Sequence, residues 1–265
     1  MTLPGFFAPT RDLRAKTCDA DILNCDARHT FPTRHTKPET RNPPCRRVDC
    51  LQMSKPATFN PDCQHCPRLS AFLGAVRDEY PDYYARPVPP FGAEDPKLLV
   101  VGLAPGMHGA NATGRPFTGD YAGILLYKTL HDYGFSNRGV SKSANDGLTL
   151  KGARITNAVK CLPPQNAPTT DEINECNAYL RDEIAALKPG TVILALGTIA
   201  HQAVLKALGL KAGAHRFAHG AEHRLTHGLI LIDSYHSSRY NMNTRRLTEA
   251  MFRQVFDKVS ASVRA

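Results

Sequence analysis

The residues best suited to chemistry stand at or just after short apolar runs. The first run, residues 98–101, leads into a glycine-rich polar loop that contains Phe117 and ends at Asp120. Asn157 lies in a second apolar run, and His236 follows the last one. Ligands bind at the carboxyl ends of buried parallel strands, so an aromatic ring, a carboxylate, an amide and an imidazole meeting there would form a binding or catalytic site.

A second chemical pattern is formed by cysteines. Cys63 and Cys66 have the C-x2-C spacing that brings two thiolates to one metal ion or cluster. Cys161 and Cys176 are the other candidate ligands, although a single cysteine near a strand end is usually a small core residue. A zinc ribbon would pair C-x2-C with a second C-x2-C, which this spacing lacks.

Residues 1–52 differ in composition from the rest of the chain. They are rich in Pro, Thr, Arg and Asp and show no sustained helical or strand period. We predict a disordered N-terminal tail over residues 1–52 and a single domain over residues 53–265. The tail's cysteines lack the C-x2-C spacing and are interpreted as unrelated free thiols: Cys18, Cys25, Cys45 and Cys50.

The composition favours a polyanionic partner. The chain has 265 residues, a net charge of +9 and a pI near 9.2, which suits nucleic acid, although basic proteins without such a partner are common. No apolar run is long enough to span a membrane, and the N-terminus lacks the pattern of a signal peptide. We therefore expect a cytoplasmic protein with no membrane partner. A monomer is a separate expectation, since nothing in the composition fixes the oligomeric state.

The apolar periodicity alternates between strands and helices. This alternation predicts an α/β protein with three layers, α/β/α, around a mostly parallel four-stranded sheet. In the helix at residues 121–133, Ile124, Leu125, Tyr127 and Leu130 are expected to face inward. The predicted strands are residues 98–101, 155–159, 191–197 and 229–233. One predicted helix begins at Pro67, and four others span residues 121–133, 171–187, 198–208 and 244–259.

The glycine-rich turn after the first strand does not fit a nucleotide-binding fold. The spacing G-x-G-x-x-G is absent, and Pro105 removes a backbone N–H that a pyrophosphate would need. A G-K-[ST] sequence is also absent, which excludes a Walker A loop.

Three motifs in order resemble those of the family 5 uracil-DNA glycosylases, the UDGb type. GLAPG, HGAN, TGRPF and TGD, between Gly102 and Asp120, are similar to the first active-site motif of that family. ITNAVKCLPPQN at residues 155–166 is similar to its uracil-binding strand, and YHSSRYNMNT at residues 235–244 to its HPS-type loop. The likeness runs from about residue 62 to the C-terminus.

The resemblance implies a uracil-DNA glycosylase-like fold and a monofunctional enzyme that hydrolyses the N-glycosidic bond of uracil in DNA, initiating base excision repair. It also implies a structural [4Fe-4S] cluster held by Cys63, Cys66, Cys161 and Cys176, with zinc as the runner-up. A different class of protein, a non-catalytic iron-sulfur or zinc protein that binds nucleic acid, would need the charge and the cysteines but not the three motifs. No motif positions a lysine nucleophile, so no lyase activity is expected.

Within the resemblance, each site residue has an expected role. Phe117 would stack on the flipped base, Asn157 would read its N3–H and O4 edge, and His236 would donate to O2 as negative charge develops. The loop after His236 has the composition for gripping phosphates. The remaining residues assigned to substrate binding are Gly102, Leu103, Gly106, Ser238, Arg239 and Asn241.

Of the expected roles, that of the group that orients the attacking water is the one least determined by the motifs. Asp120 is the candidate, with Asn111 and Asn166 as alternatives. Leu103 stands where the related family 4 enzymes carry an acidic residue, which implies a roomier pocket and acceptance of other deaminated bases such as hypoxanthine. Ser237 replaces the proline that usually follows the histidine, and we expect a looser loop there.

Overall fold

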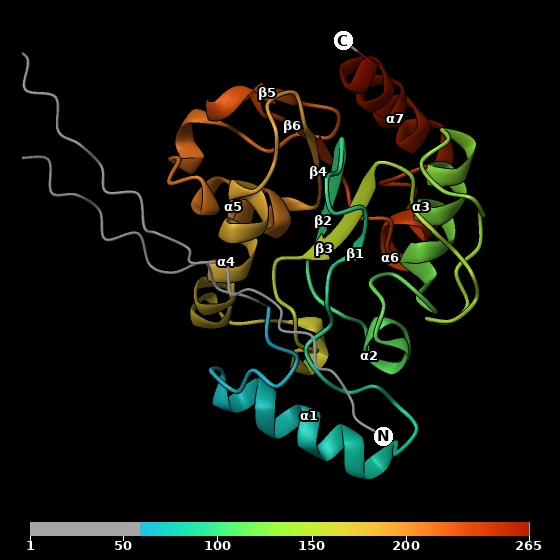
Figure 1. Cartoon of the computed structure of the whole chain (residues 1–265), viewed down its shortest axis with the longest axis vertical. Helices are drawn as coiled ribbons and strands as arrows, with labels where there is room; N and C mark the ends of the chain where they lie inside the picture. The colour runs from blue at the N-terminus through green and yellow to red at the C-terminus, as the bar shows by residue number, and fades with distance from the viewer. Residues whose placement is uncertain (1–58, 265) are drawn as a thin grey trace, which may run out of the picture. The chain divides into compact units, whose positions relative to one another are not determined.

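The computed structural model describes residues 59–264, so the predictions for the tail and its four cysteines lie outside the described residues. Within that range the chain builds one mixed sheet with the strand order β1-β3-β2-β4-β6-β5 (Figure 1). The four central strands are parallel. They are β3 (Ala153–Asn157), β2 (Leu98–Gly102), β4 (Val192–Leu196) and β6 (Ile230–Ser234).

The predicted three-layer α/β architecture is confirmed, but the predicted count of four strands is wrong. Two short strands pair antiparallel with the outer members of the parallel set: β1 (Phe91–Gly92) with β3, and β5 (Glu222–Arg224) with β6. Segments of two and three residues are too short to show an alternating pattern, so periodicity could not predict them.

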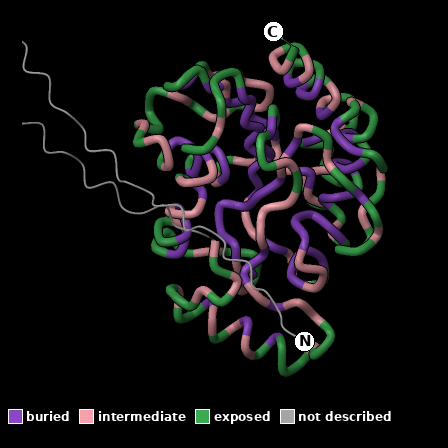
Figure 2. The backbone as a smooth tube through the Cα atoms, viewed as in Figure 1, coloured by how far each residue is buried: buried purple, intermediate pink, exposed green. Residues whose placement is uncertain are grey.

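Helices cover both faces of the sheet. The helices α3 (Tyr121–Asp132) and α7 (Glu249–Arg264) lie on one face, and α4 (Thr170–Ala185) and α5 (Thr198–Ala207) lie on the other (Figure 1). Side chains of β2 alternate between the two cores, so that Leu98 and Val100 pack toward α3 and α7, while Leu99 and Val101 pack toward α4 and α5. The sheet is accordingly the most deeply buried part of the fold (Figure 2).

The helix boundaries follow local chemistry. A capping box starts α4, in which the Thr169 hydroxyl accepts from the backbone N–H of Glu172 while the Glu172 carboxylate accepts from the backbone N–H of Thr169. Gly134, with φ of 82°, ends α3 in the left-handed conformation, as expected of a glycine after a helix.

Two helical predictions were wrong. Residues 244–259 do not form one helix, because α6 (Arg239–Asn243) ends early, Arg245 adopts a φ of 56°, and α7 begins only at Glu249. Ile124 does not face inward and is 66% exposed, whereas Leu125 and Leu126 carry the buried face of α3.

The remaining elements are short or peripheral. The helix α1 (Pro67–Glu79) lies beyond the carboxyl edge of the sheet, and α2 (Ala110–Thr113) interrupts a segment predicted to be entirely loop (Figure 1). Within residues 59–264 no helix is both long enough and apolar enough to cross a membrane. Three single-turn 3-10 helices complete the described elements: Pro164–Asn166, Ala212–Ala214 and Thr226–Gly228.

Candidate active site and cysteine cavity

A cavity of about 340 Å³ lies at the carboxyl ends of the parallel strands. It gathers residues from β3, from the loop between β2 and α3, and from the loop after β6, which are far apart in the sequence. Most of the predicted site residues line it. The lining residues are Leu103, Ala104, Gly106, Phe117, Asp120, Tyr121, Ala122, Asn157, Asn166, His236, Ser238 and Arg239.

Gly102, the last residue of β2, makes room for two of these side chains. A Cβ atom at this position would lie 2.4 Å from Asn157 Oδ1 and 2.7 Å from the Phe117 ring. Any larger residue would therefore displace the ring and the amide from the cavity. Gly102 shapes the site without lining it.

Phe117 is held in a backbone conformation that non-glycine residues rarely adopt. Its φ is 56°, and its carbonyl oxygen lies where a Cβ atom on Gly123 would be. Such strain persists only where the surroundings impose it and is concentrated at functional sites. The ring lies 5.8 Å from the His236 ring, centroid to centroid, with a 30° angle between their planes.

Asn157, the last residue of β3, presents an unused acceptor. Its side chain is 3% exposed, and its Oδ1 has no hydrogen-bond partner among the described residues. Buried polar atoms are nearly always paired, so an unpaired one that lines a cavity is positioned to bind a ligand. The amide can accept one hydrogen bond and donate others.

Asp120 is enclosed by glycines. Its Oδ2 accepts from the backbone N–H of Ala110 at 3.0 Å, and its carboxylate occupies the space that Cβ atoms on Gly106 and Gly109 would fill. Burial raises the pKa of this carboxyl, although the Ala110 hydrogen bond and the nearby His108 oppose the shift. The carboxylate is therefore a better proton acceptor than a surface aspartate would be.

His236 is kept neutral by its surroundings. Burial lowers the pKa of its imidazole from 6.5 to about 4, and neither ring nitrogen has a hydrogen-bond partner among the described residues. No side chain among residues 59–264 holds the ring by a hydrogen bond. The neutral ring still carries one N–H that can donate to a ligand.

The loop after β6 is fixed by three polar contacts. Ser237 does not loosen it, since this buried hydroxyl donates to the carbonyl of Ala122 at 2.9 Å. Asn241 was predicted to bind substrate, but it does not line the cavity. Its Nδ2 instead donates to the backbone carbonyl of His236 at 2.8 Å and so helps to hold that residue in place. Ser238 caps α6, and Arg239 is exposed with its Cζ 5.0 Å from the Tyr121 ring centroid.

Sequence reasoning missed part of the lining. Ala104, Tyr121 and Ala122 have no distinctive chemistry, and only their places beside GLAPG and TGD pointed to the site. Asn166 lines the cavity and adopts a φ of 55°. Asn111, the other alternative for orienting water, is fully buried outside the lining, and neither of its amide atoms has a partner among residues 59–264.

The four predicted cysteines line a second cavity together. Cys63 and Cys66 come from the segment that starts α1, Cys161 follows β3, and Cys176 lies in α4. All four are free thiols, and the backbone N–H of Lys160 donates to Cys176 Sγ at 3.2 Å. Thiolate sulfurs that converge in this way can hold a metal ion or a cluster.

The electrostatics and the spacing of these sulfurs limit which metal ion or cluster the cavity could hold. Burial, and then the charges of neighbouring cysteines, raise the pKa of Cys66 to about 11 and that of Cys161 further. Four thiolates in such a place need a cation to offset their charge. No three of them lie within 4.8 Å of one another, whereas thiolates around one zinc ion would be about 3.8 Å apart, given Zn–S bonds of about 2.3 Å.

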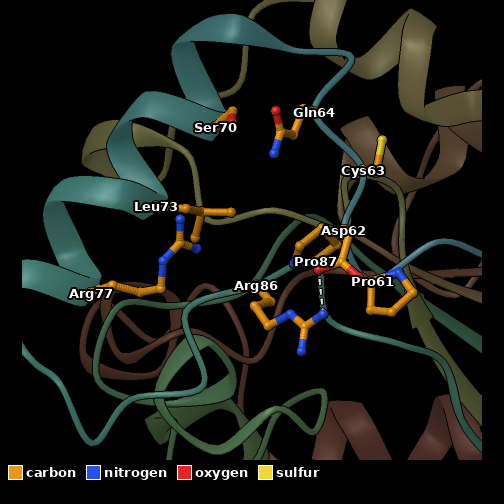
Figure 3. Close-up of a pocket in the computed structure, with 9 residues that line it drawn as sticks. All are labelled: Pro61, Asp62, Cys63, Gln64, Ser70, Leu73, Arg77, Arg86 and Pro87. Atoms are coloured by element: carbon orange, nitrogen blue, oxygen red, sulfur yellow. Dashed lines mark hydrogen bonds and ion pairs between the residues drawn. The ribbon is translucent and has the colours of Figure 1, made fainter.

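The cysteine cavity shares Cys63, Ser70 and Pro87 with an adjoining hollow. Asp62, Arg77 and Arg86 line it (Figure 3). Arg86 forms an ion pair with Asp62, and Arg77 Nη1 donates to the carbonyl of Ala85 at 2.7 Å, so both guanidinium groups are already engaged. It contains none of the residues predicted to bind a base.

A third group of convergent side chains was not anticipated. His201 Nδ1 lies 2.7 Å from Asp233 Oδ1, and His223 Nε2 lies 3.1 Å from Asp233 Oδ2. These distances are those of hydrogen bonds to a buried carboxylate, and we interpret the group as a hydrogen-bonded triad rather than a metal centre. His201 and Asp233 are 32 residues apart, so no spacing motif revealed it.

The family comparison agrees with this geometry. The family model described as the uracil DNA glycosylase superfamily matches residues 89–260, which include the whole parallel sheet and every cavity-lining residue. The chain belongs to the uracil-DNA glycosylase superfamily. The resemblance inferred from the motifs is thereby confirmed.

Curated relatives of the type-5 class are similar over most of the chain. The chain is 46% identical over 200 residues to a type-5 uracil-DNA glycosylase of Thermus thermophilus, covering 73% of this chain and 90% of the relative. It is 43% identical over 203 residues to a type-5 enzyme of Pyrobaculum aerophilum, covering 75% and 88%. A type-4 uracil-DNA glycosylase of Saccharolobus solfataricus is 28% identical over 180 residues, covering 66% and 76%.

Proposed function

We propose that this protein is a monofunctional uracil-DNA glycosylase of the type-5 class, acting in base excision repair. The observation that carries the proposal is the meeting of Phe117, Asn157 and His236 in one cavity, where the Asn157 acceptor has no partner in the described part of the chain. A merely nucleic-acid-binding protein would not need a strained phenylalanine whose ring lies 5.8 Å from the ring of a neutral histidine. The non-catalytic alternative is not favoured.

The cavity offers recognition and leaving-group stabilisation. A uracil flipped from the duplex would lie against the Phe117 ring, with its N3–H donating to Asn157 Oδ1. As the C1′–N1 bond breaks, both electrons move to the base and negative charge collects on O2. The neutral His236 ring donates an N–H to that oxygen, which stabilises the anion.

Water addition at C1′ completes the hydrolysis. The buried Asp120 carboxylate, with its raised pKa, orients the water and accepts its proton, or offsets the positive charge that develops on the sugar. Asn166 lines the same cavity and provides a second polar contact. Ser238 and Arg239 at the rim contact the phosphates beside the flipped nucleotide.

The pocket also suits other deaminated bases. Leu103 contributes no carboxylate to the lining, so a purine-sized base with a 6-oxo group meets neither a negative charge nor an unpaired acceptor there. Hypoxanthine is the expected additional substrate. DNA containing uracil or hypoxanthine is the only partner that the activity requires, and a monomeric protein in the cytoplasm stays a prediction.

We further propose that Cys63, Cys66, Cys161 and Cys176 hold a structural [4Fe-4S] cluster. The support is a cavity lined by all four sulfurs, spaced too widely for one zinc ion, with a backbone N–H donated to Cys176. The cluster would join α1 to β3 and α4. Protein purified without oxygen should contain about four iron atoms per chain and absorb broadly as iron-sulfur thiolate sites do. Zinc without iron would contradict the assignment.

The activity is tested with one labelled oligonucleotide containing a single uracil. Incubation with the protein and then alkali should cleave the strand only at the uracil, and a strand containing thymine at that position is the control. Strand cleavage before alkali treatment would indicate a lyase, and an intact strand would leave only a binding function.

A further inference from the structure

Exposed apolar side chains gather next to the proposed base cavity. Among residues 59–264 the large hydrophobic side chains that face solvent are Tyr121 (38% exposed), Ile124 (66%), Val140 (60%) and Tyr240 (71%). Tyr121, Ile124 and Val140 line one groove of about 400 Å³, and Tyr240 follows Arg239, which lines it too. Apolar groups gathered in one exposed place commonly mark a binding surface.

The groove is continuous with the base cavity. Asp120, Tyr121 and Arg239 line both spaces and form the wall between them. The Arg239 guanidinium lies over the Tyr121 ring at 5.0 Å, which orders the two side chains at the rim. A strand that delivers one base to the cavity can therefore place its neighbouring nucleotide in the groove across this wall.

The far side of the groove is held in place from within the protein. Arg115, only 3% exposed, donates from Nη2 to Ser141 Oγ at 2.6 Å and to Asp146 Oδ2 at 2.8 Å. The same carboxylate oxygen accepts from the backbone N–H of Lys142 at 2.8 Å. These contacts hold the segment that follows Val140 in place, and the apolar side chain of Val140 is 60% exposed beside it.

We propose that this groove binds the nucleobase next to the excised one on the same DNA strand. The proposal rests on the glycosylase function and adds a second nucleotide subsite to it. Ile124, Val140 and Tyr121 offer an apolar surface to the face of a base, while Lys142 and Arg239 supply positive charge for the flanking phosphates. The groove presents no buried, unpaired amide like that of Asn157, so it should accept any base.

Two neighbouring nucleotides would then leave the stack during binding. Unstacking a second base costs least in single-stranded or mismatched DNA. The protein should therefore bind uracil in single strands and at mismatches more tightly than uracil in a paired duplex.

The test combines groove variants with altered DNA. Single-stranded oligonucleotides would carry one 2′-fluoro-2′-deoxyuridine, which resists hydrolysis, with the neighbouring base intact or removed on the 5′ or the 3′ side. Removing the base on one of these sides should weaken binding by wild-type protein about fivefold or more, the lower end of what stacking on protein side chains contributes. Ile124→Ala combined with Val140→Ala should lose similar affinity for intact DNA and show no further loss when that base is removed.

A matched control is Val263→Ala, an apolar truncation in α7, which should retain the full dependence on the neighbouring base. The proposal is overturned if wild-type protein is insensitive to both neighbours, or if the double variant remains as sensitive as wild type. Failure of the glycosylase function would look different, because ordinary deoxyuridine placed in the same oligonucleotides would then survive incubation with the protein whatever its neighbours.

Discussion

Two histidines near the strand β6 have opposite surroundings. His201, from α5, is 1% exposed, and both of its nitrogens are engaged: Nδ1 with Asp233 of β6 and Nε2 with the carbonyl of His215. Because a carbonyl only accepts, Nε2 carries a proton. His236 follows the same strand and has no partner for either nitrogen among the described residues.

The pKa values move in opposite directions for this reason. Burial disfavours the charged form of both rings and lowers the pKa of His236 to about 4. For His201 the hydrogen bond and charge of Asp233 outweigh burial and raise the pKa. Satisfied polar groups stabilise a fold, whereas groups left unpaired in a cavity are ready for a ligand, and Asn157 belongs with His236 in this respect.

The largest expected effect is the loss of stability on removing the Asp233 carboxylate that pairs with His201. Asp233→Ala leaves a charged or unpaired His201 in the core and should lower the free energy of unfolding by about 3 to 5 kcal/mol, as for other broken buried ion pairs. Chemical denaturation measures this, with His131→Ala, an exposed histidine, as the control. Excision per folded molecule should change little. Unaltered stability would mean that the triad contributes nothing to the fold.

His236→Ala should slow excision and leave the stability of the fold nearly unchanged, the opposite of the effect of Asp233→Ala. Loss of one donor to a developing anion costs about 2.7 to 4 kcal/mol, or about 100- to 1,000-fold in rate. The single-turnover excision rate should fall by that factor while unfolding and affinity for uracil-containing DNA stay close to wild type. A variant that loses only affinity would show that the loop clamps DNA, and catalysis would then rest on Asp120.

Two buried asparagines, one in the cavity and one hydrogen-bonded in the core, test the same difference between open and satisfied polar groups. Asn157→Asp places a charge against the base and removes a donor, which should weaken uracil excision by about 1 to 3 kcal/mol or more. Asn177, whose Nδ2 donates to the Ala203 carbonyl at 2.8 Å, is the matched control. Asn177→Asp should lower stability and spare the excision rate of the folded protein. Undiminished excision by Asn157→Asp would exclude this residue from base recognition.

The smallest effect concerns pH. NMR titration should give a midpoint near 4 for His236 and one above the ordinary value for His201. Since the His236 pKa is lower when folded, this residue favours unfolding increasingly as pH falls from about 7 to about 4, given an unfolded value of about 6.5. The stabilisation from His201 is complete below its unfolded pKa and is lost as pH rises through the folded value. A His236 midpoint near 6.5 would contradict its burial.

The sequence alone determined where along the chain the four parallel strands and most of the long helices lie, and which residues form most of the site. Apolar runs and caps are local signals, and GLAPG, ITNAVKCLPPQN and YHSSRYNMNT carry their residue types in short segments. It could not give the edge strands β1 and β5, whose pairing depends on partners distant in the chain rather than on their own few residues.

Tertiary structure decided which side chains are satisfied and which are left open. Periodicity places Ile124 on an apolar stripe of α3, but only the packing of neighbouring elements leaves it facing solvent beside the groove. The contacts of Arg115 with Asp146, and of His201 with Asp233, join residues about thirty positions apart. No local pattern encodes such pairs, because they form only when the sheet brings separate segments to the same place.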